Sequence, residues 1–479
     1  MVDLDWKSTK MVSSANKSPK ISANTKSVQF SVPPPIRISD ISPASSSSCS
    51  AYEQYIRYSE LSKLQTCKDF PNWKNESILK PALQGLEISF RFISIVLSDP
   101  RPYANHREWK RRLESLTTHQ IELIAILCED GENDSESRGT APIVDLSTSN
   151  GMLARDGSMA EVWKLPGESE THVVNKTSEA SLLPRLATWK KSEDIASKIM
   201  FSIECEMRRC SFTLGLGEPN LSGKPNLNYD RICKPSELHS LKTSSFEQSK
   251  LNNYENQTLV TIHQILESWI QASKGILKRI GARIEDQDYD QASSDCWLLE
   301  RIWKLLADIE DLHVLMDPDD FLRLKNQLSI KASSESEAFC FRSKGLIDIT
   351  KLSKDLKHKV PAILGVEVDP KGGPRIQEAV MKLYHSHKKS DSGKIHLLQA
   401  LQAIESGLKR FFFSYRQLIM TVMGSLEARG NRCLNLTESA DSLSQIFLEP
   451  TYFPSLDAAK TFLGDFWQYE HGVMRTTRP

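Results

Sequence analysis

The feature that most constrains the fold is a run of apolar residues that recurs at helical spacing in the second half of the chain. Leu298, Ile302, Leu305, Ile309 and Leu312 follow one another in alternating steps of four and three. This spacing places side chains along one seam of a packed helix pair. Similar apolar stripes occur within residues 76–98, 105–129, 191–210, 256–270, 374–388 and 393–427. We therefore predict an all-α, multi-helix bundle.

The remaining segments suggest three regions. Residues 1–50 are rich in Ser, Lys and Pro, and we expect a disordered tail because few large apolar side chains offset its chain entropy. Residues 51–210 form an N-terminal helical region, interrupted by a loop insertion at 130–190 in which we expect one small β-hairpin. Residues 211–479 form a C-terminal helical region that opens with a loop-like stretch to about residue 255. We expect the two helical regions to pack as one body.

Two short runs inside the insertion have β character. They are residues 142–146 and 160–165, and Gly, Ser and Asn clusters surround both. Such runs bounded by turn residues indicate strands.

Charge and cysteine content exclude several classes of protein. Formal net charge is zero and the pI is about 7.2, without the basic footprint of a nucleic-acid binder. Nine cysteines are scattered without a Cys-x-x-Cys pair, which argues against a zinc site or a disulfide framework. The most apolar run, residues 88–97, is interrupted by Arg91 and is shorter than the ~20 residues of a membrane span. We expect a cytoplasmic protein that binds neither nucleic acid nor membrane, and the oligomeric state stays open.

No motif for catalysis is intact. Gly215-Leu216-Gly217 and Gly372-Gly373 match neither phosphate-binding fingerprint, and no Gly-x-Ser-x-Gly occurs. The acids Asp308, Glu310 and Asp311 lack the spacing of a calcium loop, and we interpret them as a solvated helix face. The sequence therefore predicts no catalytic residue, no metal ligand and no cofactor, and a protein that is not an enzyme.

One serine in the insertion is a candidate phosphorylation site. Ser158 follows Arg155 by three residues, with apolar Leu153 and Val162 five residues before it and four after it. This pattern resembles the substrates of energy-sensing kinases of the SNF/AMP-activated type. The pattern is short, and its place in a Gly-containing loop adds slightly to the case for Ser158.

Several longer segments resemble the plant HSPRO family of nematode-resistance-protein-like proteins. They are Phe70-Pro71-Asn72-Trp73, Ser98–Tyr103, Arg107–Leu116, Gly139–Leu146, Ile203–Cys210, Leu315–Leu322, Val368–Arg375 and Pro450–Asp457. The resemblance implies a non-enzymatic regulator of plant basal defence and stress response that acts by protein–protein interaction. It also implies a partner, the βγ-type regulatory subunit of the plant SNF-related energy-sensing kinase. No catalytic residue comes with the family.

A fainter resemblance concerns Ser414-Tyr415-Arg416-Gln417-Leu418-Ile419, which is similar to the haem-bearing helix of the indoleamine/tryptophan dioxygenase superfamily. That helix supplies an axial histidine where this chain has Arg416, a degenerate haem-ligand position. An arginine stays protonated and is not a normal ligand of haem iron. The alternative function is thus a haem or small-molecule-binding protein of dioxygenase-like fold with residual or lost activity. In that case His263, His313 and His396 are the candidates for a substitute ligand.

Overall fold

The computed structural model describes part of the chain, and all described residues belong to one compact unit, Ser42–Pro479. They are residues 52–129, 143–144, 160–163, 172–175, 181–187, 189–216, 225–242, 254–318, 343–367, 375–385, 391–423, 446 and 448–463. The predicted tail at 1–50 and the candidate phosphorylation site Ser158 lie outside these ranges.

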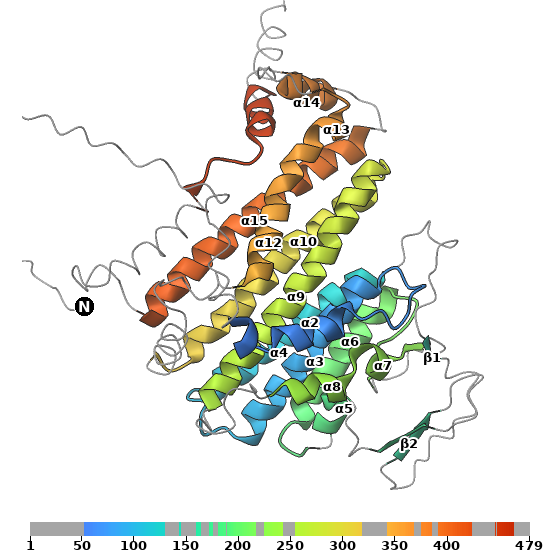
Figure 1. Ribbon diagram of the computed structural model, residues 1–479, viewed down its shortest axis with the longest axis vertical. Helices are drawn as coiled ribbons and strands as arrows, with labels where there is room; N and C mark the ends of the chain where they lie inside the picture. The colour runs from blue at the N-terminus through green and yellow to red at the C-terminus, as the bar shows by residue number, and fades with distance from the viewer. Residues whose placement is uncertain are drawn as a thin grey trace, which may run out of the picture. The chain divides into compact units, whose positions relative to one another are not determined.

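Helices dominate the described part (Figure 1). In the first half they are α2 (Tyr58–Thr66), α3 (Glu76–Ser98), α4 (His106–Cys128), α5 (Leu182–Leu186), α6 (Glu193–Glu206), η2 (Met207–Arg209), α7 (Tyr229–Cys233), α8 (Pro235–His239) and η3 (Ser240–Lys242). In the second half they are α9 (Tyr254–Glu285), α10 (Tyr289–Glu310), η4 (Asp311–Leu315), α12 (Lys344–Asp355), η6 (Leu356–Lys359), α13 (Val360–Leu364), α14 (Arg375–His385) and α15 (Ser392–Met423). Residues 454–463 are also helical. The predicted all-α, multi-helix architecture is confirmed.

The two longest helices of the first half, α3 and α4, lie next to each other, and α3 is buried along nearly its whole length. Apolar side chains at Leu83, Leu86, Phe90 and Phe92 form its contribution to the core. Both helices begin and end within one residue of the predicted bounds, because their apolar periodicity is local and uninterrupted.

Helix α9 is the central element, since it packs against α3 on one side and α10 on another. Helices α9 and α3 run antiparallel. They approach closely because each of them has a glycine where the two helices meet. A Cβ atom on Gly85 would lie 3.0 Å from Nε1 of Trp269, and one on Gly275 would lie 2.6 Å from Cγ1 of Ile78. Removing two side chains lets the helix backbones approach.

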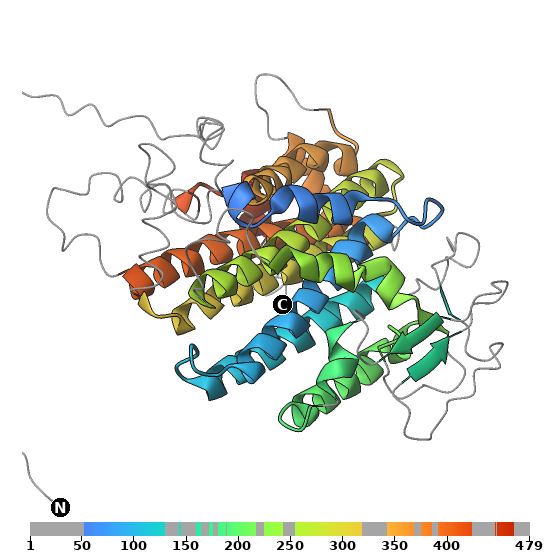
Figure 2. The same ribbon diagram turned by 60° about the horizontal axis from the view of Figure 1, so that its bottom comes forward.

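The predicted apolar seam forms the interface of α10 with its neighbours. Its five members are all buried, and α10 makes its largest interface with α15. Asp290 lies beside Gly393, and the ring of Trp303 lies 5.5 Å from that of Phe411, so the two helices run in the same direction. Figures 1 and 2 both show α9, α10 and α15 side by side.

The four short strands pair differently from the sequence prediction. Both β-like runs do contain strands, β1 (Ile143–Val144) and β2 (Ala160–Trp163). However, β1 pairs with β4 (Asn226–Leu227), whereas β2 forms the hairpin with β3 (His172–Asn175). The hairpin was expected and its second strand was not identified, because strand pairing depends on partners that local pattern does not reveal.

The stretch at 211–255 is also more ordered than predicted. It contains α7, α8 and η3 as well as β4. Gly215 adopts a left-handed φ of 80°, and a Cβ atom there would lie 2.6 Å from the carbonyl oxygen of Leu227. Both the backbone conformation and the close approach favour glycine at this turn. None of the helices in the described ranges combines the length and apolarity needed to cross a bilayer.

Candidate functional site

The histidines considered as substitute haem ligands fall in different environments. His396 is exposed on α15, whereas His263 on α9 and His313 in η4 are buried. The two buried imidazoles lie together, with ring centroids 5.3 Å apart and planes tilted by 41°. Arg416 is half-buried on α15.

His263 and His313 belong to a buried polar group that we call the histidine cluster, made of Tyr52, His263, Glu267, Glu310 and His313. The hydroxyl of Tyr52 donates to Oε1 of Glu267 at 3.0 Å and lies 3.4 Å from Nδ1 of His263. On the other side, Nδ1 of His313 lies 2.8 Å from the carbonyl oxygen of Glu310 and 3.1 Å from its Oε2. Glu310 was interpreted as part of a solvated face, and this is wrong: it is buried against His313.

Burial sets the protonation of the cluster. Burial, followed by the neighbouring His313, holds the pKa of His263 well below that of an ordinary histidine. Burial also raises the pKa of Glu267, and the hydrogen bonds from Ser343 and Tyr52 offset only part of this. Burial and the Glu267 carboxyl raise the pKa of Tyr52 well above its usual range. At neutral pH, His263 is therefore a neutral imidazole and Tyr52 a neutral phenol.

A second buried group centres on Glu87 of α3. Its carboxylate accepts hydrogen bonds from Ser181 Oγ at 2.7 Å, from Leu182 N–H at 2.8 Å and from the hydroxyl of Tyr229 at 3.1 Å. His239 Nε2 lies 2.9 Å away. Burial alone would raise the pKa of Glu87, but these contacts, led by His239, hold it below its usual range. The carboxylate thereby fixes α5, α7 and α8 on α3.

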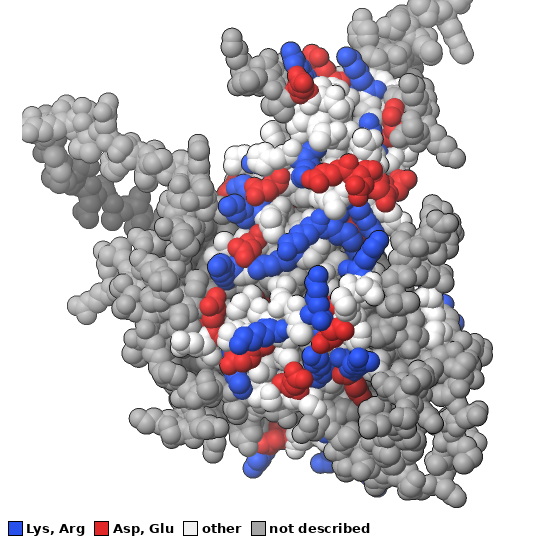
Figure 3. Space-filling view, turned by 45° about the vertical axis from the view of Figure 1, so that its right-hand side comes forward, with Lys and Arg blue, Asp and Glu red and all other residues white. Residues whose placement is uncertain are grey.

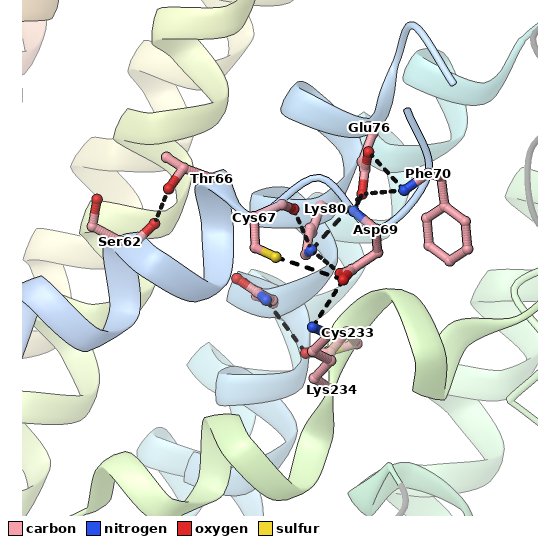
Figure 4. Close-up of polar contacts among 10 residues, drawn as sticks. Ser62, Thr66, Cys67, Asp69, Phe70, Glu76, Lys80, Cys233 and Lys234 are labelled. Carbon is pink, nitrogen blue, oxygen red and sulfur yellow. Dashed lines mark hydrogen bonds and ion pairs between the residues drawn. The ribbon is translucent and has the colours of Figure 1, made fainter. Parts of the chain in front are cut away.

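The Phe70-Pro71-Asn72-Trp73 segment is preceded by a polar clamp (Figure 4). Asp69 binds the ammonium group of the fully buried Lys80 on α3 and that of Lys234, between α7 and α8, the latter at 3.0 Å. Glu76 accepts the backbone N–H groups of Asp69 at 2.8 Å and of Phe70 at 3.2 Å. Partial burial would raise the pKa of Asp69, and the two ammonium groups lower it. The clamp ties the loop before α3 to α3 itself and, through Lys234, to a segment 165 residues later.

The Pro450–Asp457 segment is held on α15 in a comparable way. Glu405 accepts the backbone N–H of Tyr452 at 3.0 Å. Lys354 binds Glu449 at 2.9 Å, and its ammonium group lies 5.2 Å from the Tyr452 ring centroid. Lys409 approaches the same ring to 5.0 Å. Two lysines on one tyrosine ring are a cation–π arrangement that fixes this segment.

These charged groups therefore position chain segments. Within the described residues, no three His, Cys, Asp or Glu side chains are placed to bind a common metal ion. Sequence reasoning missed Tyr52, Glu87 and Asp69. No local signal could have found the contact of Tyr52 with His263, since 211 residues separate the two.

The surface offers mixed charge and isolated aromatic side chains. On the face in Figure 3, basic and acidic residues are interspersed. Five aromatic side chains of the described residues are exposed: Phe201 on α6 (62%), Phe462 in the helical residues 454–463 (51%), Phe413 on α15 (47%), Trp297 on α10 (46%) and Trp189 between α5 and α6 (39%). Aromatic residues are enriched among those that dominate protein–protein binding energy.

Comparison with known proteins places the chain. No solved structure matches it, so the resemblance to the dioxygenase fold stays a prediction. Two Arabidopsis thaliana proteins, named Nematode resistance protein-like HSPRO2 and HSPRO1, are each 52% identical over 98% of this chain, and the matches cover 100% and 99% of their own lengths. The family model of the Hs1pro-1 N-terminus matches residues 1–204, and that of the Hs1pro-1 protein C-terminus matches residues 207–469. The resemblance found in the sequence is thus confirmed, and the chain belongs to the Hs1pro-1 family.

Proposed function

We propose that this chain is a plant defence protein that acts in the cytoplasm by binding protein partners and not by catalysis. The observation that carries the proposal is the 52% identity, over nearly the full length of both chains, to proteins named nematode resistance protein-like. Identity at this level across whole chains supports a shared role in defence.

The internal chemistry supports binding over catalysis. Catalytic acids and bases must be within hydrogen-bond reach of a reactant. Here the carboxylate of Glu87 is saturated by donors from the protein, and that of Glu405 holds the Tyr452 segment. Acids engaged in this way stabilise the fold, which leaves the surface as the place where the protein acts.

The partner we propose is the βγ-type regulatory subunit of the SNF-related energy-sensing kinase, as the family resemblance implies. Phe201, Trp297 and Phe413 are the exposed aromatic residues through which we propose contact. Ser158 is the residue we propose as a substrate of the associated kinase.

Binding between the two purified proteins tests the partner. We expect a Kd of roughly 1 µM or tighter by isothermal titration calorimetry, about −8 kcal/mol. Among the single variants Phe201→Ser, Trp297→Ser and Phe413→Ser, at least one should weaken binding about tenfold or more. Arg111→Ser, at an exposed position on α4, is the matched control and should bind like the unmodified chain.

The outcomes separate the partner from the role in defence. Absence of binding at roughly 100 µM would overturn the partner. Counting nematodes on roots of plants that lack or regain the chain tests the role in defence independently, and equal counts would overturn it. Kinase treatment followed by phosphopeptide mapping of the unmodified chain and of Ser158→Ala tests the serine.

A further inference from the structure

The first described segment of the chain, residues 52–57, lies as a strap against α9. Tyr52, Tyr55 and Ile56 are buried in it. The carbonyl oxygen of Ile56 accepts a hydrogen bond from Nε2 of Gln264 at 3.1 Å, and the hydroxyl of Tyr52 donates to Glu267. The strap therefore meets α9 along one face, over a single turn of helix.

The strap covers His263 through the side chain of Tyr52. Tyr52 meets the ring of His263 edge-on, with centroids 5.6 Å apart, and His313 packs against the same imidazole from another side. His263 is thus enclosed by a phenol from the strap and by a second imidazole from η4.

The groups facing this site come from every element around it. The strap contributes Tyr52 and Glu53, and Tyr58 follows at the start of α2. From α9 come Glu267 and Lys274, and from α10 and η4 come Glu310, Asp311 and His313. Ser343, just before α12, bonds to Glu267, and Asp348 on α12 binds Lys274. Glu310 lies against His313 and Glu267 is bonded to Tyr52. Both carboxylates are thus engaged by other groups. Adding a proton to His263 creates a buried cation beside a second imidazole, and a buried charge requires solvation.

We propose that the histidine cluster is an acid-sensitive latch, which holds residues 52–57 on α9 at neutral pH and releases them when His263 binds a proton. Water can reach the imidazolium most easily by displacing the strap, because the strap is six residues long and meets α9 over a single turn of helix. Helices α9, α10 and α12 are fixed by extensive packing instead. Histidine is suited to this role because it changes charge between about pH 5 and 8. The proposal does not depend on the identity of the protein partner.

Hydrogen exchange of the full chain, read by mass spectrometry at about pH 7.5 and about pH 5.5 and corrected for intrinsic rates, tests the latch. We expect protection of the peptide covering residues 52–57 to fall by up to about tenfold at the lower pH, since an exposed histidine has a pKa of about 6.5. Protection of α4 should stay well above that of the strap at both pH values, because α4 exchanges only when the whole fold opens.

Variants locate the effect. His263→Gln cannot gain a charge and should abolish the pH dependence of the strap, and His263→Leu should do the same if His263→Gln does not fold. His396→Gln, at an exposed position, is the control and should keep the dependence. Equal protection of the strap at both pH values would overturn the proposal. So would equal protection of the strap and α4 at about pH 5.5, since the strap would then exchange only through global unfolding.

Discussion

The indole N–H of Trp269 on α9 donates to Oε1 of Gln120 on α4 at 2.8 Å. The amide of the same glutamine donates through Nε2 to Oγ of Ser89 on α3 at 2.7 Å. All three side chains are fully buried. One amide thus joins three helices and satisfies polar groups that would otherwise be stranded in the core.

Replacing this amide by a thioether of similar length is therefore expected to destabilise the fold. Gln120→Met leaves the buried indole N–H without its acceptor, which costs ~1–3 kcal/mol. Urea unfolding followed by circular dichroism measures this as a lower midpoint at unchanged slope. Glu122→Met, two residues along α4 in a partly exposed ion pair with Arg301, is the control and should change the free energy of unfolding by less than about 1 kcal/mol. Equal effects of the two substitutions would contradict the role given to Gln120.

The same substitution at two glycines of α9 should have opposite effects. Gly275→Ala places a Cβ atom 2.6 Å from Cγ1 of Ile78, and the overlap is expected to cost ~1–3 kcal/mol. Gly281→Ala meets nothing within 4 Å and should gain about 0.5–1 kcal/mol from helix propensity. Thermal unfolding of both variants checks the signs. A stabilised Gly275→Ala would show that α3 and α9 are not in close contact there.

Stability should fall in mild acid because of His263. Its pKa is lowered in the folded protein, so below about pH 6.5 the unfolded chain binds a proton that the folded chain does not. The free energy of unfolding then rises with pH, and it decreases as pH falls from 6.5 toward the folded pKa, by up to ~1.4 kcal/mol per pH unit. Urea titrations across this range measure the slope. His263→Gln should reduce the slope and His396→Gln should not; identical slopes in all three proteins would contradict the assignment.

Adding haem to the purified protein tests whether it binds haem as a dioxygenase does. We expect no sharp Soret band in the absorption spectrum of the purified protein, as isolated or after adding haem. The resemblance to the dioxygenase helix puts Arg416 where that helix has its histidine, and a guanidinium does not ligate haem iron. His263 and His313 contact Tyr52 and Glu310 instead. A sharp band at stoichiometric haem would contradict this, and its loss in His263→Gln or His313→Gln would identify the ligand.

The bounds of the long helices were predictable from the sequence, and the contacts between segments far apart in the chain were not. The helix at 76–98 was predicted with the bounds that α3 has, because Leu83, Leu86 and Phe90 repeat within a few turns. The short helices α7 and α8 have five residues each, too few to show a period. The pairing of β1 with β4 and the contact of Tyr52 with His263 join segments far apart in sequence. Each depends on the completed fold, which explains why the histidine cluster was not foreseen although both histidines were named.

The close packing of α3 against α9 also determines when this protein can fold during synthesis. Arg91 on α3 bonds to Gln264, 173 residues later. The side of α3 that packs against α9 therefore stays exposed until α9 leaves the ribosome. At ~5–20 residues per second this delay is roughly 10–35 s. Such distant contacts also slow the search for the native topology. The nascent N-terminal helices therefore pass through a period of exposed apolar surface, in which aggregation competes with folding.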